Sequence, residues 1–403
     1  MIRAALLSVV LVTAVWGVLH VGWYAHRQIV DYGIYMRYGD KVVHEHAVPY
    51  RDFALEYPPG ALPMFVLPSL VRSSQYQHVF QVLGALCLAA AAFAAYLISG
   101  RRAAVLTAIA PLALGSVVLS RFDLWPTALA VLSLAAAVRG RRGLSAVLIG
   151  TAFAAKLWPL LLVPLLGVWI ARSEGGRAAA RWLGIAAAAA AAWFLPFVIL
   201  SPSGVAHSFH AQIARPLQLE SLGAAVLIAL HHTAGTSLSV VSSYGSQNVS
   251  GTGSHAVEVA TTVVGLLALA AAYVAFARGD ADVYDLLRYA AGVVAISIAF
   301  GKVFSPQFLI WLIPLVPLIR GRRGAFAIPA FFTALVLTQL WFPSRYWRLA
   351  DSFAQAQSWE LLARDLAVVA LVAVLLWPRS EHEMLGEYRT RVEALQRVRG
   401  QVE

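Results

Sequence analysis

Two lysines stand alone inside apolar stretches of this sequence. Lys156 lies in the run GTAFAAKLWP, and Lys302 lies in the run FGKVFSPQ, where Ser305 and Gln307 follow it closely. A cation at membrane depth is costly unless it has a partner, and it therefore marks a functional site by default. Ser305 followed by Pro306 is typical of a helix start, whose free N–H groups bind anions. These features predict a phosphate site; the alternative for Lys156 is a side chain that reaches the lipid headgroups.

Acids, aromatic rings, histidines and prolines crowd the segment between residues 30 and 60. Asp31 lies just past the first apolar run, so we expect its carboxylate to be partly desolvated. Desolvation raises the pKa of a carboxyl group and suits it to act as a general base. The alternative is a helix-end residue at the level of the headgroups. His44 and His46 are more typical of surface histidines than of a metal pair, and no set of metal ligands is evident.

A third short motif, RFDLWP, carries Arg121 and Asp123 at a turn that we place on the outer side of the membrane. Two residues apart, these charges can also simply satisfy each other. Near the end of the chain, Arg345 and Arg348 either join the phosphate site or anchor the protein to lipid headgroups.

The composition excludes most classes of soluble protein. Of the 403 residues, 60% are hydrophobic and 13% are charged, and the charged share is about half that of soluble domains. The net charge is +11, but the arginines sit in short clusters between long apolar runs. This pattern orients a membrane protein and does not indicate nucleic-acid binding. The only cysteine is Cys87, which excludes a disulfide scaffold. The fold class we expect is all-α, a polytopic integral membrane protein.

Basic clusters and apolar runs together predict the topology. With every arginine cluster in the cytoplasm, the crossings balance if the run 144–171 crosses twice, as a broken hairpin with Lys156 near its apex. About twelve spans of about 20 residues result, with both termini inside. The transmembrane domain is residues 1–378, and the charged tail 379–403 is expected to form a cytoplasmic surface helix. The apolar runs are 4–21, 78–98, 103–119, 122–138, 144–171, 180–200, 256–277, 284–301, 305–319, 325–342 and 358–377.

The outer face receives two long segments, residues 22–77 and 201–255. Within the second, residues 221–232 are apolar but too short to span, so we expect them to lie flat or to re-enter. Residues 233–254 are rich in Ser, Gly and Thr, which predicts a flexible loop. Most of the isolated acids, histidines and lysines fall on this side, so a site would face outward from the cell membrane.

Short motifs of charged and aromatic residues follow one another between about residue 20 and residue 320. They are Asp31-x-x-x-Tyr35, Pro49-Tyr50-Arg51-Asp52-Phe53, Glu56-Tyr57-Pro58-Pro59, Arg121-Phe122-Asp123, Lys156-Leu157-Trp158-Pro159 and Lys302-x-x-Ser305-Pro306-Gln307. In this order they resemble glycosyltransferase family 87, the polyprenol-phosphate-mannose-dependent α-1,2-mannosyltransferases of the GT-C superfamily. The resemblance implies a GT-C-like helical bundle whose first outer loop carries the catalytic acid.

The resemblance also implies an inverting transfer of a hexose, most simply mannose, from a polyprenyl-phosphate donor to a glycolipid or polysaccharide acceptor. It makes Asp31 the base that deprotonates the acceptor hydroxyl. It assigns the donor phosphate to Lys156, Lys302 and Arg121, with no cofactor. Tyr57 and Trp311 would stack on sugar faces. The remaining substrate-binding residues implied are Tyr35, Asp52, Glu56, Asp123, Ser305 and Gln307, and His207 and His210 are candidates for acceptor contacts.

Three other functions fit parts of the sequence. A transporter or flippase for a polyprenyl-linked or amphiphilic substrate would place polar residues near the bilayer midplane, often with inverted repeats. A structural membrane protein would leave the isolated lysines and the acid-rich first loop unexplained. A transferase that uses polyprenyl-phosphate arabinose would share the same chemistry.

Overall fold

The computed structural model describes residues 2–25 and 31–378, so the predicted surface helix in residues 379–403 lies outside the described residues. The described chain is largely helical and carries one two-stranded sheet. The helices of the first half are α1 Ile2–Leu19, α2 Gly22–Ala25, α3 Tyr32–Val43, α4 Leu62–Ser69, α5 Tyr76–Ser99, α6 Arg101–Leu114, α7 Val117–Ser120, α8 Leu124–Val138, α9 Arg142–Ala155, α10 Val163–Glu174 and α11 Gly176–Leu200.

The second half of the chain contains the sheet and the remaining helices. They are α12 Pro202–Ile213, α13 Leu222–Ala234, β1 Leu238–Ser243, β2 Ser246–Gly251, α14 Ser254–Arg278, α15 Val283–Ala299, α16 Leu309–Leu312, α17 Gly321–Trp341, α18 Tyr346–Ser352 and α19 Gln355–Leu376. Short 3₁₀ turns cover η1 Pro59–Ala61, η2 Ser73–Gln75, η3 Trp158–Leu162, η4 Pro306–Phe308 and η5 Val316–Leu318.

The predicted break in the run 144–171 is confirmed. Helix α9 ends at Ala155, and Lys156 adopts an extended backbone conformation (φ −159°, ψ 148°). The chain then resumes through η3, which carries Pro159 in its first turn, and continues as α10. Pro159 lacks the N–H that would donate to the carbonyl of Ala155, and in a continuous helix its ring would clash with that carbonyl, so the helix stops here. Lys156 therefore lies at an interruption between two helices.

Two expectations from the sequence were wrong in detail. The run 305–319 is not one continuous helix, because its prolines remove backbone donors and leave only η4, α16 and η5. The expected flexible loop at 233–254 contains the antiparallel hairpin of β1 and β2. Tyr244 and Gly245 connect the strands, both with positive φ (52° and 68°), as a tight type I′ turn requires. The high Ser and Gly content hid this strand pattern.

Within the described part of the chain, five segments are long and apolar enough to cross a membrane: Ile2–Leu19, Ser73–Ser99, Gly176–Leu200, Ser254–Arg278 and Gly321–Trp341. Helices α11 and α14 bury little of their surface within the protein, and they expose large apolar side chains such as Leu195 and Leu266. Exposed apolar helical surface of this extent is suited to lipid. The protein is thus a multi-pass membrane protein, while the count of about twelve spans and their orientation stay predictions.

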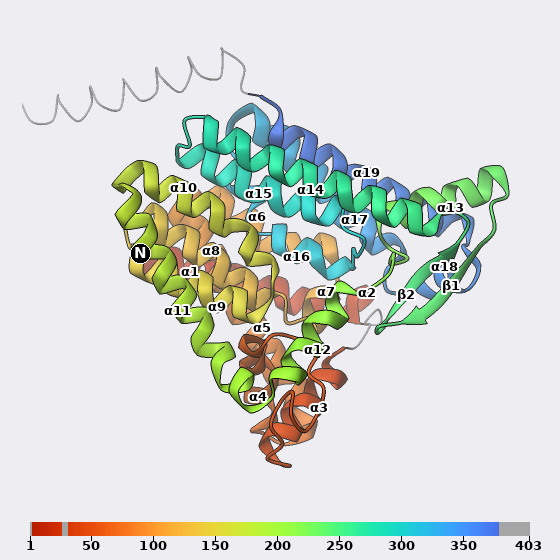
Figure 1. Ribbon diagram of the computed structural model, residues 1–403, viewed down its shortest axis with the longest axis horizontal. Helices are drawn as coiled ribbons and strands as arrows, with labels where there is room; N and C mark the ends of the chain where they lie inside the picture. The colour runs from red at the N-terminus through yellow and green to blue at the C-terminus, as the bar shows by residue number, and fades with distance from the viewer. Residues whose placement is uncertain (1, 26–30, 379–403) are drawn as a thin grey trace, which may run out of the picture.

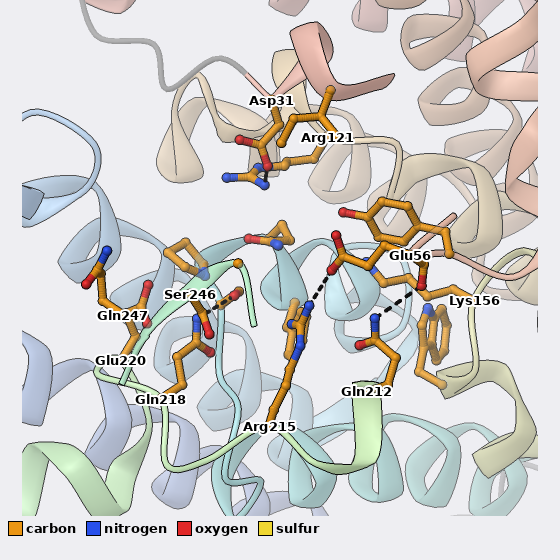
Figure 2. A pocket seen from close by; sticks show the side chains of 18 of the residues that line it. Asp31, Glu56, Arg121, Lys156, Gln212, Arg215, Gln218, Glu220, Ser246 and Gln247 are labelled. Carbon is orange, nitrogen blue, oxygen red and sulfur yellow. Dashed lines mark hydrogen bonds and ion pairs between the residues drawn. The ribbon is translucent and has the colours of Figure 1, made fainter. Parts of the chain in front are cut away.

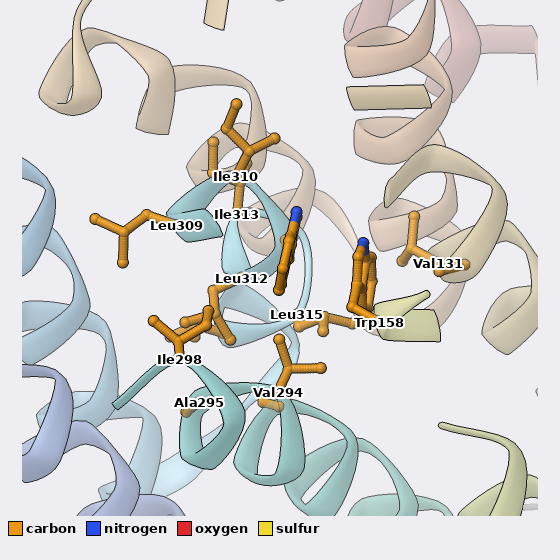
Figure 3. Close-up of a cluster of buried hydrophobic side chains, with 14 of the residues drawn as sticks. Val131, Trp158, Val294, Ala295, Ile298, Leu309, Ile310, Leu312, Ile313 and Leu315 are labelled. Atoms are coloured by element: carbon orange, nitrogen blue, oxygen red, sulfur yellow. The ribbon is translucent and has the colours of Figure 1, made fainter. Parts of the chain in front are cut away.

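The helices surround the short broken segment around α16. Figure 1 shows α14, α15 and α19 on one side of α16 and α8, α9 and α11 on the other, with α3 and α4 at one end and the hairpin at the side. The apolar side chains of α16 pack against α8 and α15 (Figure 3), as with Leu309, Leu312 and Ile298, which are fully buried. This packing fixes the position of the residues just before α16.

Candidate active site

A cavity of about 600 Å³ opens where the first loop, the α7–α8 turn, the Lys156 break, α12, the hairpin and the segment before α16 meet. Figure 2 shows charged and amide side chains from these separate parts of the chain pointing into it. Of the residues named from the sequence, the following line the cavity: Asp31, Glu56, Tyr57, Arg121, Lys156, Ser305, Gln307 and Trp311. Residues far apart in sequence thus form one site.

Lys156 is held from several sides. Its Nζ donates to Asp123 Oδ1 at 2.6 Å, and the same oxygen accepts from Trp311 Nε1 at 2.6 Å. The ammonium also lies 4.8 Å from the centroid of the Phe122 ring and 5.5 Å from that of Trp311. Trp311 itself stacks on Trp158 at 5.3 Å. Asp123 is 1% exposed and does not line the cavity, so it holds Lys156 in place, and its own contact with substrate stays a prediction.

Arg121 forms an ion pair with Asp31 at the edge of the cavity. The two side chains come from the α7–α8 turn and from the residue before α3, and both are largely buried. An arginine beside a carboxylate stabilises its ionised form.

Glu56 forms a third ion pair, with Arg215 of the segment after α12. The backbone carbonyl of Glu56 accepts hydrogen bonds from Ser208 Oγ and from Gln212 Nε2, both at 3.2 Å. These contacts tie α12 to the first loop. Sequence reasoning missed Arg215, although it is the only charged residue between Arg181 and Glu220 and the argument made for the isolated lysines applies to it.

The first loop approaches α9 closely at Gly60. A Cβ atom at this position would lie 2.6 Å from the backbone carbon of Ala154, so a side chain there is excluded. The Gly60 carbonyl also accepts from Trp125 Nε1 at 3.0 Å. This contact brings the neighbouring Glu56 and Tyr57 to the cavity beside the Lys156 break.

Several residues named from the sequence lie outside the cavity lining. Tyr35 is buried among the rings of Phe65, Phe80 and Phe122. Lys302 Nζ donates to Glu258 Oε1 of α14 at 3.1 Å. His207 and His210 lie on the exposed face of α12. Because none of these four residues lines the cavity, the substrate contacts predicted for them stay predictions.

Asp52 also lies outside the lining and pairs with its neighbour. Its side chain is exposed and accepts from Arg51 Nε at 2.8 Å. The hydrogen bond from Arg51 lowers the pKa of Asp52 to about 2, so this carboxylate is ionised at any physiological pH. A permanently ionised, exposed carboxylate paired in this way is suited to shaping the loop between Val48 and Phe53, and any contact with substrate stays a prediction.

The second residue that sequence reasoning missed is Glu220, an acid that lies between α12 and α13 and lines the cavity. It is 4% exposed, and burial raises its pKa to about 7. Gln218, Ser246 and Gln247 lie at the same end of the cavity in Figure 2. One end of the cavity is therefore rich in ion pairs, and the hairpin end carries amides, hydroxyls and a carboxyl group.

Apolar helices that enclose a cavity lined by paired charges define a multi-pass membrane protein with a polar cavity. The chain belongs to glycosyltransferase family 87, whose sequence profile matches residues 55–306. This confirms the resemblance of the motifs. The matched stretch contains Glu56, Arg121 and Lys156 and begins after Asp31.

Among solved structures, the chain matches the crystal structure of ArnT from Cupriavidus metallidurans bound to undecaprenyl phosphate. It aligns with a TM-score of 0.48 and 15% sequence identity, over 92% of this chain and 77% of that chain. A search of curated protein sequences gives no significant match.

Proposed function

We propose that this glycosyltransferase moves a hexose, mannose in the first instance, from a polyprenyl-phosphate donor to a glycan or glycolipid acceptor. Transfer takes place on the outer face of the cell membrane with inversion at the anomeric carbon. The observation that carries the proposal is the convergence of three cation–carboxylate pairs on one cavity within a helical membrane protein of family 87. A lipid-linked donor suits a cavity enclosed by lipid-facing helices, because its phosphate can enter from the membrane.

In this mechanism the lipid phosphate binds to Lys156 and Arg121. Lys156 has the fixed position that charge stabilisation in the transition state requires, because Asp123 and the surrounding rings hold its ammonium in place. Arg121 exchanges its contact with Asp31 for the phosphate. Lys302, assigned to the phosphate from the sequence, would have to leave Glu258 to take part.

Asp31 then acts as the general base. Its carboxylate takes the proton of an acceptor hydroxyl, whose oxygen attacks the anomeric carbon. The bond between that carbon and the phosphate oxygen breaks, and polyprenyl phosphate leaves with one additional negative charge. Lys156 and Arg121 stabilise that charge. Ser305 and Gln307, which line the cavity in the segment before α16, hydrogen-bond the donor in this proposal.

The test is transfer of radiolabelled mannose from polyprenyl-phosphate mannose into lipid products of membranes that carry the protein. We compare the wild type with Asp31→Asn and with Asp40→Asn, a matched change in the first loop outside the cavity lining. Loss of a general base lowers kcat by about 10²- to 10⁴-fold, so Asp31→Asn should nearly abolish labelling while Asp40→Asn retains it. Full turnover in Asp31→Asn contradicts the base assignment. Labelling from polyprenyl-phosphate arabinose, with none from the mannose donor, contradicts the hexose assignment.

A further inference from the structure

Strand β2 of the hairpin is hydrogen-bonded along both of its edges. Besides pairing with β1, strand β2 pairs with residues 217–219: Leu219 N donates to Gln247 O at 2.9 Å, and Val249 N donates to Leu217 O at 2.8 Å. Gln218 N in turn donates to Lys302 O at 2.8 Å. Backbone bonds on both sides make this a fixed wall of the cavity, because strand pairing leaves little freedom of position.

This wall presents Gln218, Glu220, Ser246 and Gln247 to the cavity, a group that we call the hairpin arm (Figure 2). Gln218 is 3% exposed, and its Nε2 donates to Ser305 Oγ at 2.9 Å. Its Oε1 is buried and has no hydrogen-bond partner among the described residues. A buried acceptor without a partner is destabilising, and such an atom facing a cavity is suited to accept a hydrogen bond from a ligand.

Glu220 repeats this feature. Its Oε2 is buried and lacks a hydrogen-bond partner within residues 2–25 and 31–378. The backbone carbonyl of Glu220 accepts from Arg364 Nη2 at 2.6 Å, and its carboxyl group is hydrogen-bonded to the Tyr346 side chain, so the residue is held in place while Oε2 is left for a ligand. The hairpin arm therefore offers two buried oxygen acceptors, and both of them need a donor.

The charges of the cavity select the class of ligand. The lining cations Arg121, Lys156 and Arg215 are each already paired with a carboxylate. An anionic group in the hairpin arm would instead face Glu220. Hydroxyl groups both donate and accept hydrogen bonds, which matches the mixture of carboxyl, amide and hydroxyl groups in the arm. Trp347, which also lines the cavity and is largely exposed, offers an aromatic surface for the C–H face of a sugar ring.

We infer that the hairpin arm is the acceptor subsite and that it binds a neutral sugar unit, whose hydroxyls donate to Gln218 Oε1 and to the Glu220 carboxyl group. The inference rests on the proposed glycosyl transfer. The donor phosphate is assigned to the end of the cavity with Lys156, and the acceptor must approach the anomeric carbon from the side opposite the leaving phosphate. The hairpin arm lies at the other end of the cavity from Lys156 in Figure 2.

The experiment measures two affinities of the full-length protein in detergent. The acceptor probes are radiolabelled octyl monoglycosides of mannose, glucose and arabinose, and the donor probe is polyprenyl-phosphate mannose. The variants are Gln218→Leu and Gln247→Ala, with Ser250→Ala as the control in the same strand but outside the cavity lining. We expect the wild type to bind at least one glycoside. Each arm variant should weaken that binding about five- to tenfold, since one hydrogen bond is lost.

Donor affinity should change less than about twofold in both arm variants, and Ser250→Ala should match the wild type in both assays. Retained donor binding also shows that each variant is folded. If Gln218→Leu does not fold, Gln247→Ala on the hairpin surface still tests the acceptor subsite. The inference is wrong if the wild type binds none of the glycosides, or if both arm variants bind them normally. The inference is also wrong if the variants lower the affinity for the donor as much as the affinity for the glycoside, because the hairpin arm would then bind the donor sugar.

Failure of the proposed function gives a different result. The wild type would then bind no polyprenyl-phosphate mannose, whatever it does with the glycosides. Glycoside binding that still depends on Gln218 and Gln247 would in that case support a neutral sugar site without the transfer reaction.

Discussion

The ion pair between Lys156 and Asp123 combines a structural role and a proposed ligand-binding role that mutations can separate. Lys156→Met leaves the Asp123 carboxylate, 1% exposed, with the indole of Trp311 as a hydrogen-bond donor and without its cation. Breaking a buried ion pair by removing one partner costs about 3–5 kcal/mol. We therefore expect a clear fall in unfolding temperature as well as loss of donor binding, and the single variant alone cannot tell the two roles apart.

The double variant Lys156→Met with Asp123→Asn removes both charges and keeps an oxygen that can accept from Trp311. Its unfolding temperature should return close to that of the wild type. Its donor affinity should stay low, because a hydrogen bond between a charged group and phosphate contributes about 1.5–3 kcal/mol, or about 10- to 150-fold in Kd. Asp123→Asn alone is the matched control. It frees the ammonium from its carboxylate, so donor affinity should be at least that of the wild type.

The assay uses full-length protein in detergent micelles. Tryptophan fluorescence reports the unfolding temperature, and equilibrium binding of tritiated polyprenyl-phosphate mannose reports the donor Kd. Recovery of donor affinity together with stability in the double variant would refute the reasoning. Lys156 would then serve only to neutralise Asp123, and the phosphate would bind elsewhere.

Three further predictions concern residues around this site. If Lys302 binds phosphate, Lys302→Ala should lower the affinity for the donor more than the affinity for the acceptor. The control is Glu258→Gln, which removes the other charge of that ion pair. Unchanged donor affinity in both variants would limit Lys302 to a structural role. Burial raises the pKa of Glu220 from an ordinary 4.5 to about 7. Between these two pH values the folded protein keeps a proton that the unfolded chain releases, so the stability of the fold falls as pH rises from about 4.5 to 7. Glu220→Gln should flatten the dependence of unfolding temperature on pH across this window, and an unchanged slope would contradict the raised pKa of Glu220. Gly60→Ala places a Cβ against the backbone of Ala154, so it should lower both unfolding temperature and transfer activity, and a variant with wild-type values would show that the first loop can shift away from α9.

The helices were largely predictable, because their cause is local. A long apolar run in a membrane protein must satisfy its backbone groups within itself, and a helix does this with bonds between neighbouring residues. The run 180–200 corresponds in this way to α11, and the run 256–277 corresponds to α14. The break at Lys156 was also readable, since Pro159 and the isolated cation interrupt an otherwise apolar stretch.

Other elements were misread where two local signals conflicted. In 305–319 the hydropathy of a span hid prolines that break the helix. In 233–254 a Ser and Gly content typical of loops hid two short strands. Strand β2 also pairs with residues 217–219, and this pairing cannot be predicted from the composition of 233–254 alone. Strands depend on partners elsewhere in the chain, and for that reason a local reading of composition failed here.

The sequence by itself determined the class of this protein, the family 87 motifs and the residue types available for chemistry, because hydropathy, charge and short motifs are properties of the chain. Only the tertiary structure decided which of those residues meet. It pairs Asp31 with Arg121 and Glu56 with Arg215, buries Tyr35, and turns Lys302 toward Glu258. It also brings Gln218, Glu220 and the hairpin to the same cavity. The physical reason is that these contacts join segments far apart in sequence, and the packing of the helices sets their distances.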